Sequence, residues 1–331
     1  MNIDTERRSG HHGTDRGNRR ARKMRADMNV WQPESGETLL ARAPVTFATG
    51  AAMRVRGMRW FRDFERHDIQ SELPGWPEGR VYTARSTGGS AARNTVKGAA
   101  IAVGVAVMGV LSFAGGNVSG STSPDSGSDT PDDRDDEVLD FPVMWAAPGT
   151  IARTLPWQLD PGRSDEKHYR THAIVTDRRL VIVGFPFHKR DLKAIEDEVL
   201  WEIPRSTVSR VERKEFKDGN DFKVAFTDGS WCRLSSIRRQ RLTRYLVSHF
   251  DLIQQDSLTQ AQQAAVNAYS VRVQAPADVS PIISRPPGGR YRVEFLLPSR
   301  LDAYFGASET NMLMDSDGRE IQAADYRPED L

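Results

Sequence analysis

The strongest constraint on the fold is a series of short segments in which apolar and polar side chains alternate and turn residues intervene. In the clearest one, FKVAF, the side chains of Phe222, Val224 and Phe226 share one side, because successive strand residues point to opposite faces. The turn sequence TDGS follows, and WCRL continues the pattern. Asp-Gly is a strong hairpin signal, so this stretch predicts two antiparallel strands with one buried face.

Neighbouring segments have the same character. Residues 173–175 and 180–183 are apolar runs on either side of TDRR, which predicts a hairpin because Asp tolerates turn conformations. Residues 198–203, EVLWEI, predict a strand that ends before a proline, and residues 208–216 predict the next. About seven short strands are expected between residues 138 and 234.

Helical spacing replaces this pattern in SSIRRQRLTRYLVSHF, where Ile237, Leu242, Leu246 and Phe250 form one stripe. A sheet of many strands must close or stack in order to bury its faces and cover its edges. The predicted fold class is therefore α+β, a small antiparallel β-barrel of about seven strands capped by a C-terminal α-helix, with long disordered flanks.

Three of these segments, HAIVTDRRLVIVG, LWEIPRSTVSRVERKEF and FKVAFTDGSWCRLSS, resemble a bacterial pleckstrin-homology-like domain, close to the GRAM type. The resemblance covers residues 138–252. It implies a seven-stranded barrel capped by a helix, and a role in binding lipids or proteins without catalysis. The loop PGRSDEKHYR mixes acids with bases, whereas phosphoinositide-binding relatives carry a denser basic cluster there.

The remaining chain divides by composition. The expected regions are a disordered basic arm (1–35), an N-terminal region with a basic-aromatic helix (36–96), an apolar Gly/Ala-rich segment (97–117), an acidic disordered linker (118–137), the barrel (138–252), and a short helix with a Pro-rich tail (253–331). The arm is either a solubilising tail or an electrostatic tether. The net charge of +1 argues against a chain that wraps nucleic acid along its whole length.

In the N-terminal region, MRVRGMRWFRDFERHDI places Met58, Phe61, Phe64 and Ile69 at helical spacing. This predicts a helix that either buries the stripe or lies on a membrane surface.

Residues 98–116 contain no charged side chain, and their length is adequate for a membrane span. Five are Gly and five are Ala, which offer little apolar area to lipid. The sequence therefore leaves two possibilities, a single span in a membrane-associated and otherwise cytoplasmic protein, or a flexible or shallowly inserted segment.

The sequence contains no catalytic motif. Seven histidines include no HExxH pair, and neither a G-x-S-x-G elbow nor a phosphate-binding lysine loop is present. Cys232 is the single cysteine, fits a reducing compartment, and is predicted to be a buried core thiol. No enzyme activity, cofactor or metal is expected.

One group of basic residues remains as a candidate anion-binding rim, on loops that converge if a barrel forms. Its members are Arg163, Lys167, Arg178, Arg179, Lys189, Arg190 and Lys193. The alternative is a set of solvated loops, since interspersed acids partly cancel the charge. The leading hypothesis is a non-catalytic membrane-associated adaptor that binds an anionic lipid surface or a protein, and the alternative is a soluble protein-interaction scaffold. No specific nucleic-acid signal and no small-molecule substrate are identified.

Overall fold

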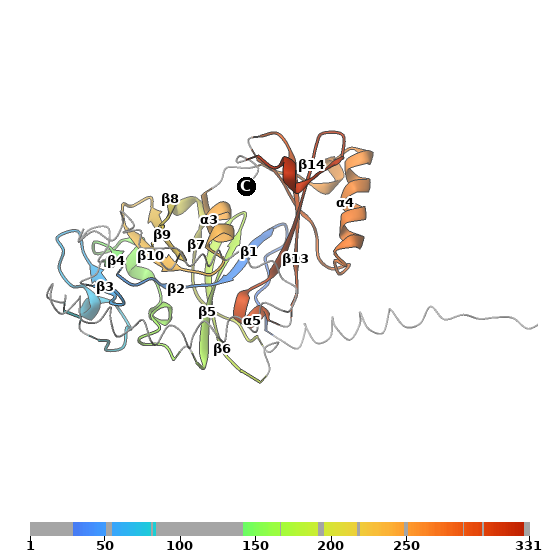
Figure 1. The fold of residues 1–331 in the computed structure, drawn as a ribbon. Coiled ribbons are helices and arrows are strands. Elements are labelled where there is room, and N and C mark those ends of the chain that lie inside the picture. Colours follow the sequence, from blue (N-terminus) through green and yellow to red (C-terminus); the bar gives the residue numbers. More distant parts are fainter. Residues whose placement is uncertain are drawn as a thin grey trace, which may run out of the picture. The chain divides into compact units, whose positions relative to one another are not determined.

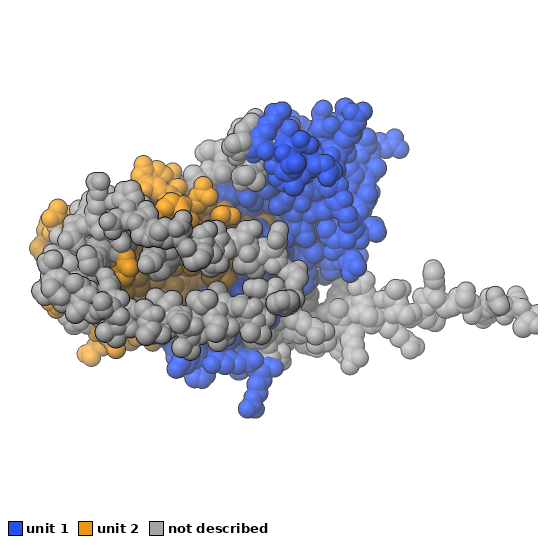
Figure 2. All heavy atoms as spheres, in the orientation of Figure 1, with its two compact units in different colours: residues 1–44, 164–206, 244–331 blue, residues 45–163, 207–243 orange. Residues whose placement is uncertain are grey.

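The computed structural model describes residues 29–50, 55–80, 82–83, 142–165, 167–190, 195–216, 219–247, 251–286, 288–299 and 301–327. These residues form three largely antiparallel sheets and few helices, which confirms the predicted α+β class (Figure 1). Two compact units are present (Figure 2). Unit 1 comprises residues 1–44, 164–206 and 244–331, and unit 2 comprises residues 45–163 and 207–243.

The first sheet of unit 1 has the strand order β1-β5-β6-β7. Its strands are β1 (Leu39–Pro44), β5 (Tyr169–Thr176), β6 (Arg179–Pro186) and β7 (Glu198–Pro204). The β5–β6 hairpin and the strand that begins at Glu198 confirm the sequence predictions. The hairpin turn is tight because the Thr176 hydroxyl accepts the backbone N–H groups of Arg178 and Arg179.

The second sheet of unit 1 is built from the C-terminal region, with the strand order β11-β12-β13-β14-β15. Its strands are β11 (Asp251–Leu252), β12 (Ile282–Arg285), β13 (Tyr291–Leu297), β14 (Ser308–Met314) and β15 (Glu320–Ile321). Helix α4 (Gln260–Arg272) begins at a capping box formed by Thr259 and Gln262, and buries Val266 and Tyr269 against Val293 and Phe295. The short helix α5 (Asp302–Phe305) precedes β14.

Residues 253–331, predicted as a short helix and a Pro-rich tail, thus contain the helix and also this sheet, which was not predicted as a whole. The alternation signal is weak because β13 and β14 bury runs of consecutive residues rather than every second one. The two strands pair with each other along their whole lengths, and these cross-strand contacts stabilise both.

Unit 2 contains one sheet with the order β3-β4-β10-β9-β8, and β2 also pairs with β10. Its strands are β2 (Thr46–Phe47), β3 (Trp60–Arg62), β4 (Pro142–Trp145), β8 (Val208–Arg213), β9 (Asp221–Phe226) and β10 (Trp231–Ser235). The β9–β10 hairpin confirms the Asp-Gly prediction, since Gly229 adopts a φ of 83° and Asp228 accepts the N–H of Ser230. Helix α3 (Arg239–Val247) follows β10.

Short 3₁₀ helices occupy connections in both units. They cover Gln70–Glu72, Ile151–Thr154, Trp157–Leu159, Arg205–Thr207, Gln255–Ser257 and Ala323–Asp325.

This topology contradicts the prediction of a closed barrel. Seven strands, β4 to β10, followed by a helix match the expected order, but they are divided between a sheet of unit 1 and the sheet of unit 2. The described residues contain no closed barrel. The free sides of β5, β4 and β10 are instead paired with strands from the N-terminal region, namely β1, β3 and β2. Local alternation identifies strands, whereas the choice of partner depends on contacts distant in sequence.

The helix predicted around Phe61 and Phe64 is also wrong. Phe61 lies in β3 and is fully buried, whereas Phe64 is exposed. The side chain of Asp63 accepts the backbone N–H groups of Glu65 and His67, and this local turn competes with a helix.

Within the residues that the structure describes, no helix has the length and apolarity that a membrane crossing requires. The candidate span, residues 98–116, lies outside the described residues, as do residues 1–28 of the basic arm and the acidic linker 118–137.

Candidate ligand-binding groove

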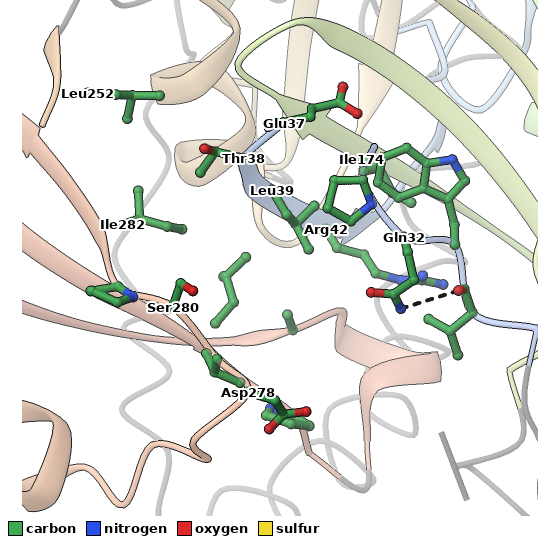
Figure 3. A pocket seen from close by; sticks show the side chains of 18 of the residues that line it. Gln32, Glu37, Thr38, Leu39, Arg42, Ile174, Leu252, Asp278, Ser280 and Ile282 are labelled. Atoms are coloured by element: carbon green, nitrogen blue, oxygen red, sulfur yellow. Dashed lines mark hydrogen bonds between the residues drawn. The ribbon is translucent and has the colours of Figure 1, made fainter. Parts of the chain in front are cut away.

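A groove with a volume of about 800 Å³ lies within unit 1, between residues that precede or form β1 and residues of the C-terminal sheet (Figure 3). Thr38, Leu39 and Ile174 contribute to one wall, and Leu252 and Ile282 contribute to the other. This volume is in the range of sites for small ligands and peptides, roughly 300–1,000 Å³.

Carboxylates hold the N-terminal wall of the groove in place. Asp197 accepts the backbone N–H of Trp31 at 2.7 Å, and Asp177 accepts that of Thr38 at 2.8 Å. Residues 30–33 line the groove without belonging to a strand, and Asp197 holds them at Trp31. The wall is thus anchored to the β5–β6–β7 part of the sheet.

A buried ion pair lies at the groove beside β1. Arg42 donates two hydrogen bonds to Asp197, at 2.6 and 2.7 Å, and its Nε donates to Nδ1 of His172 at 3.2 Å. Burial of His172, and then the charge of Arg42, lower its pKa well below the usual value, so the ring is neutral. The guanidinium of Arg42 is therefore compensated within the protein.

A second ionic network closes the end of the groove near Glu37. Its carboxylate accepts hydrogen bonds from Arg179, at 2.6 and 3.0 Å, and from the Thr176 hydroxyl at 2.6 Å. The hydrogen bonds from Arg179 lower the pKa of Glu37 to about 2, against the opposing effect of burial. The same contact raises the pKa of Arg179, which also contacts Glu34 and Glu202.

The structure does not bring the predicted rim together. Arg178 and Arg179 lie at the tip of the β5–β6 hairpin, whereas Lys167, Lys189 and Arg190 lie beyond its opposite end, because Tyr169 pairs with Pro186. An eight-residue strand separates the two groups by roughly 25 Å. Arg178 donates to the carbonyl of Gly36.

The remaining two residues of the predicted rim are Arg163 and Lys193. Arg163 belongs to unit 2, its side chain is buried, it pairs with Asp160, and it lies over the rings of Phe61 and Trp76. Lys193 lies outside the described residues. The sequence shows the charges of Arg163, Arg178 and Arg179 but not the carboxylates, carbonyl and rings that engage them.

No family model, curated protein or solved structure matches the chain. The groove must therefore be interpreted from its own chemistry.

Aliphatic side chains alternate in the groove with neutral hydrogen-bonding groups. The neutral polar lining residues are Gln32, Thr38, Gln254, Gln255, Ser280 and Ser299. The charged lining residues are Glu37, Arg42, Asp278 and Asp302, and Asp302 accepts hydrogen bonds from the backbone N–H and the hydroxyl of Ser299. Sequence analysis missed this site because half of it lies in the region interpreted as a tail, where only the short alternation of β13 signalled structure.

Three other places outside the groove carry side chains that could take part in chemistry, namely Cys232, His168 and the group of Asp63, Glu65 and His67. Cys232 is buried and burial raises the pKa of its thiol, which confirms the predicted core position. His168 is exposed beside Asp165. Asp63, Glu65 and His67 approach within 4.8 Å, a grouping that the motif search missed, and the turn hydrogen bonds of Asp63 account for their proximity.

Proposed function

We propose that this protein is a non-catalytic adaptor whose groove in unit 1 binds an extended segment of a protein partner. The observation that carries the proposal is the position of the groove beside the outermost strands of two sheets, β1 and β11. An outermost strand has one side without a strand partner, and extended peptides bind such edges through their main chain.

The side chains of the groove favour a polypeptide over an anionic lipid. Neutral amides and hydroxyls can satisfy peptide N–H and C=O groups, while the aliphatic residues between them accommodate alternate side chains. Arg42, the cation among the lining residues, is already paired with Asp197.

The order of seven strands followed by a helix also supports this proposal, since it is the order that the resemblance to a pleckstrin-homology-like domain implies. Domains of that type bind proteins or lipids without catalysis. The absence of a closed barrel among the described residues does not affect the argument, because the groove is built by β1 and the C-terminal sheet.

Selection from a peptide library of random sequence, displayed against the full chain, tests the proposal. We expect peptides in which apolar residues alternate with polar ones. Ser280→Trp, which fills the groove from an exposed position, should weaken their binding at least tenfold in fluorescence anisotropy. Ser316→Trp is the matched control, since Ser316 is exposed and lies outside the groove. Equal binding to both variants would exclude the groove as the site.

A second candidate function rests on the uncharged segment 98–116, which favours an adaptor held at a membrane. Liposome flotation of the full chain, and of a variant lacking residues 98–116, tests it across a salt series. Binding that resists salt and disappears with the deletion would indicate insertion, whereas binding that salt abolishes would indicate the basic arm. A full chain that remains unbound at low salt would exclude this candidate.

A further inference from the structure

The sheet of unit 2 carries a group of cations on one face that the proposed function does not use. Lys223 lies on β9, and its direct cross-strand partners are Arg233 on β10 and Glu212 on β8. Because directly paired strand residues point to the same face, these three side chains share it. The side chains of Arg210 and Lys214 reach the same carboxylate from β8 and the residues after it.

The two carboxylates of this face are held by other cations. Glu212 pairs with Arg210 and with Lys214, the latter at 3.2 Å, and Asp221 pairs with Arg233 at 3.4 Å. Glu212 is thus shared by two cations, and Lys223 adds a further positive charge beside them. Lys223 is the cation that these pairings leave without a carboxylate.

The ammonium of Lys223 lies over an aromatic ring instead. Its Nζ is 4.1 Å from the ring centroid of Trp231, a favourable position for a cation. Trp231 is itself fixed by stacking on Trp145, with ring centroids 6.1 Å apart and planes within 10°, and Trp145 stacks on Phe64. The lysine head group is therefore positioned by a rigid support.

The surroundings of Lys223 disfavour the protonated, positively charged form of its amine. Burial lowers its pKa to about 8, and the charges of Lys214, Arg210 and Arg233 act in the same direction. A group of like charges that an anion would relieve is typical of a site for a negatively charged ligand.

We propose that Lys223, Arg210 and Lys214 form a binding site for a phosphate group. A phosphate group is negatively charged, and its oxygens can accept hydrogen bonds from several cationic donors at once. The side chain of Arg210 is 68% exposed, so the site is open to solvent. The phosphate can belong to a soluble ion or to a lipid head group, and this site is independent of the groove in unit 1.

The first experiment titrates the full chain with sodium phosphate at constant ionic strength. Binding is followed by tryptophan fluorescence, because Trp231 lies against Lys223 and stacks on Trp145. We expect saturable binding that weakens as the pH rises above 8, because Lys223 loses its charge. Lys223→Met retains an apolar stem over Trp231 and should weaken binding at least tenfold. Lys189→Met, at an exposed lysine of unit 1, should bind as the original protein does.

The second experiment measures sedimentation of the same three proteins with vesicles that contain phosphatidic acid. Loss of vesicle binding in Lys223→Met but not in Lys189→Met, without an effect of free phosphate, would identify a lipid phosphate as the ligand. Saturable phosphate binding without this loss would identify a soluble phosphate. If Lys223→Met, shown by circular dichroism to be folded, matches the original protein with both probes, the proposal is wrong.

Discussion

Arg42 and Asp197 are separated by 155 residues in the chain, yet they form a two-point ion pair with side chains that are 7% and 1% exposed. The pair connects β1 to the residues immediately before β7, and Asp197 also holds the backbone of Trp31. It therefore fixes one wall of the groove to the first sheet of unit 1.

Asp197→Asn should lower the stability of unit 1 by about 3–5 kcal/mol, because it leaves the guanidinium of Arg42 buried without a counter-charge. The double variant Arg42→Met, Asp197→Leu should lose less, since neither charge remains buried. Urea denaturation followed by circular dichroism measures both. A single variant that is no less stable than the double variant would contradict the assigned role of this pair.

Glu37→Gln should remove the part of the protein's stability that depends on the charge of Glu37 and is lost at acidic pH. The pKa of Glu37 is lowered from 4.5 to about 2, so its contribution, roughly 3 kcal/mol, is complete above pH 4.5 and is lost as the pH falls towards 2. The original protein should be more stable than the variant at pH 6, and the difference should vanish near pH 2. Denaturation midpoints of both proteins across this range test the prediction; a constant difference would contradict it.

Gly306→Ala should destabilise the contact between the C-terminal region and β1. Gly306 has a φ of 72°, and an added Cβ would lie 2.1 Å from the carbonyl oxygen of Arg42. Gly289→Ala is the control, since Gly289 has a φ of 76° and no atom within 4 Å of the added Cβ. The control should cost about 1 kcal/mol, and Gly306→Ala should cost clearly more in thermal denaturation. Equal losses would show that the approach to Arg42 relaxes freely.

Cys232 should resist thiol reagents in the folded protein. Burial raises the pKa of the thiol, and the thiolate is the reactive species. Reaction with a disulfide reagent should be negligible in buffer and complete in concentrated urea. Rapid reaction under native conditions would place Cys232 outside the core.

Local patterns in the sequence predicted the elements that short-range physics specifies. The alternation in FKVAF, the Asp-Gly turn and the Pro204 boundary correspond to β9, the β9–β10 hairpin and the end of β7. The helix after β10 and the buried position of Cys232 were likewise accessible, because each depends on periodicity over a few residues. The helix expected around Phe61 failed because the side chain of Asp63 made a competing turn.

Sequence alone thus determined the β5–β6 and β9–β10 hairpins, the strand β7 and the helix after β10, because period, turn chemistry and side-chain type are local properties. Tertiary structure decided which strands of the first sheet of unit 1 pair with β1, and which arginines are engaged by Glu37 or Asp197. These outcomes depend on groups more than 100 residues apart, as in Arg42 with Asp197 or Arg179 with Glu37, whose proximity exists only after the sheets have formed.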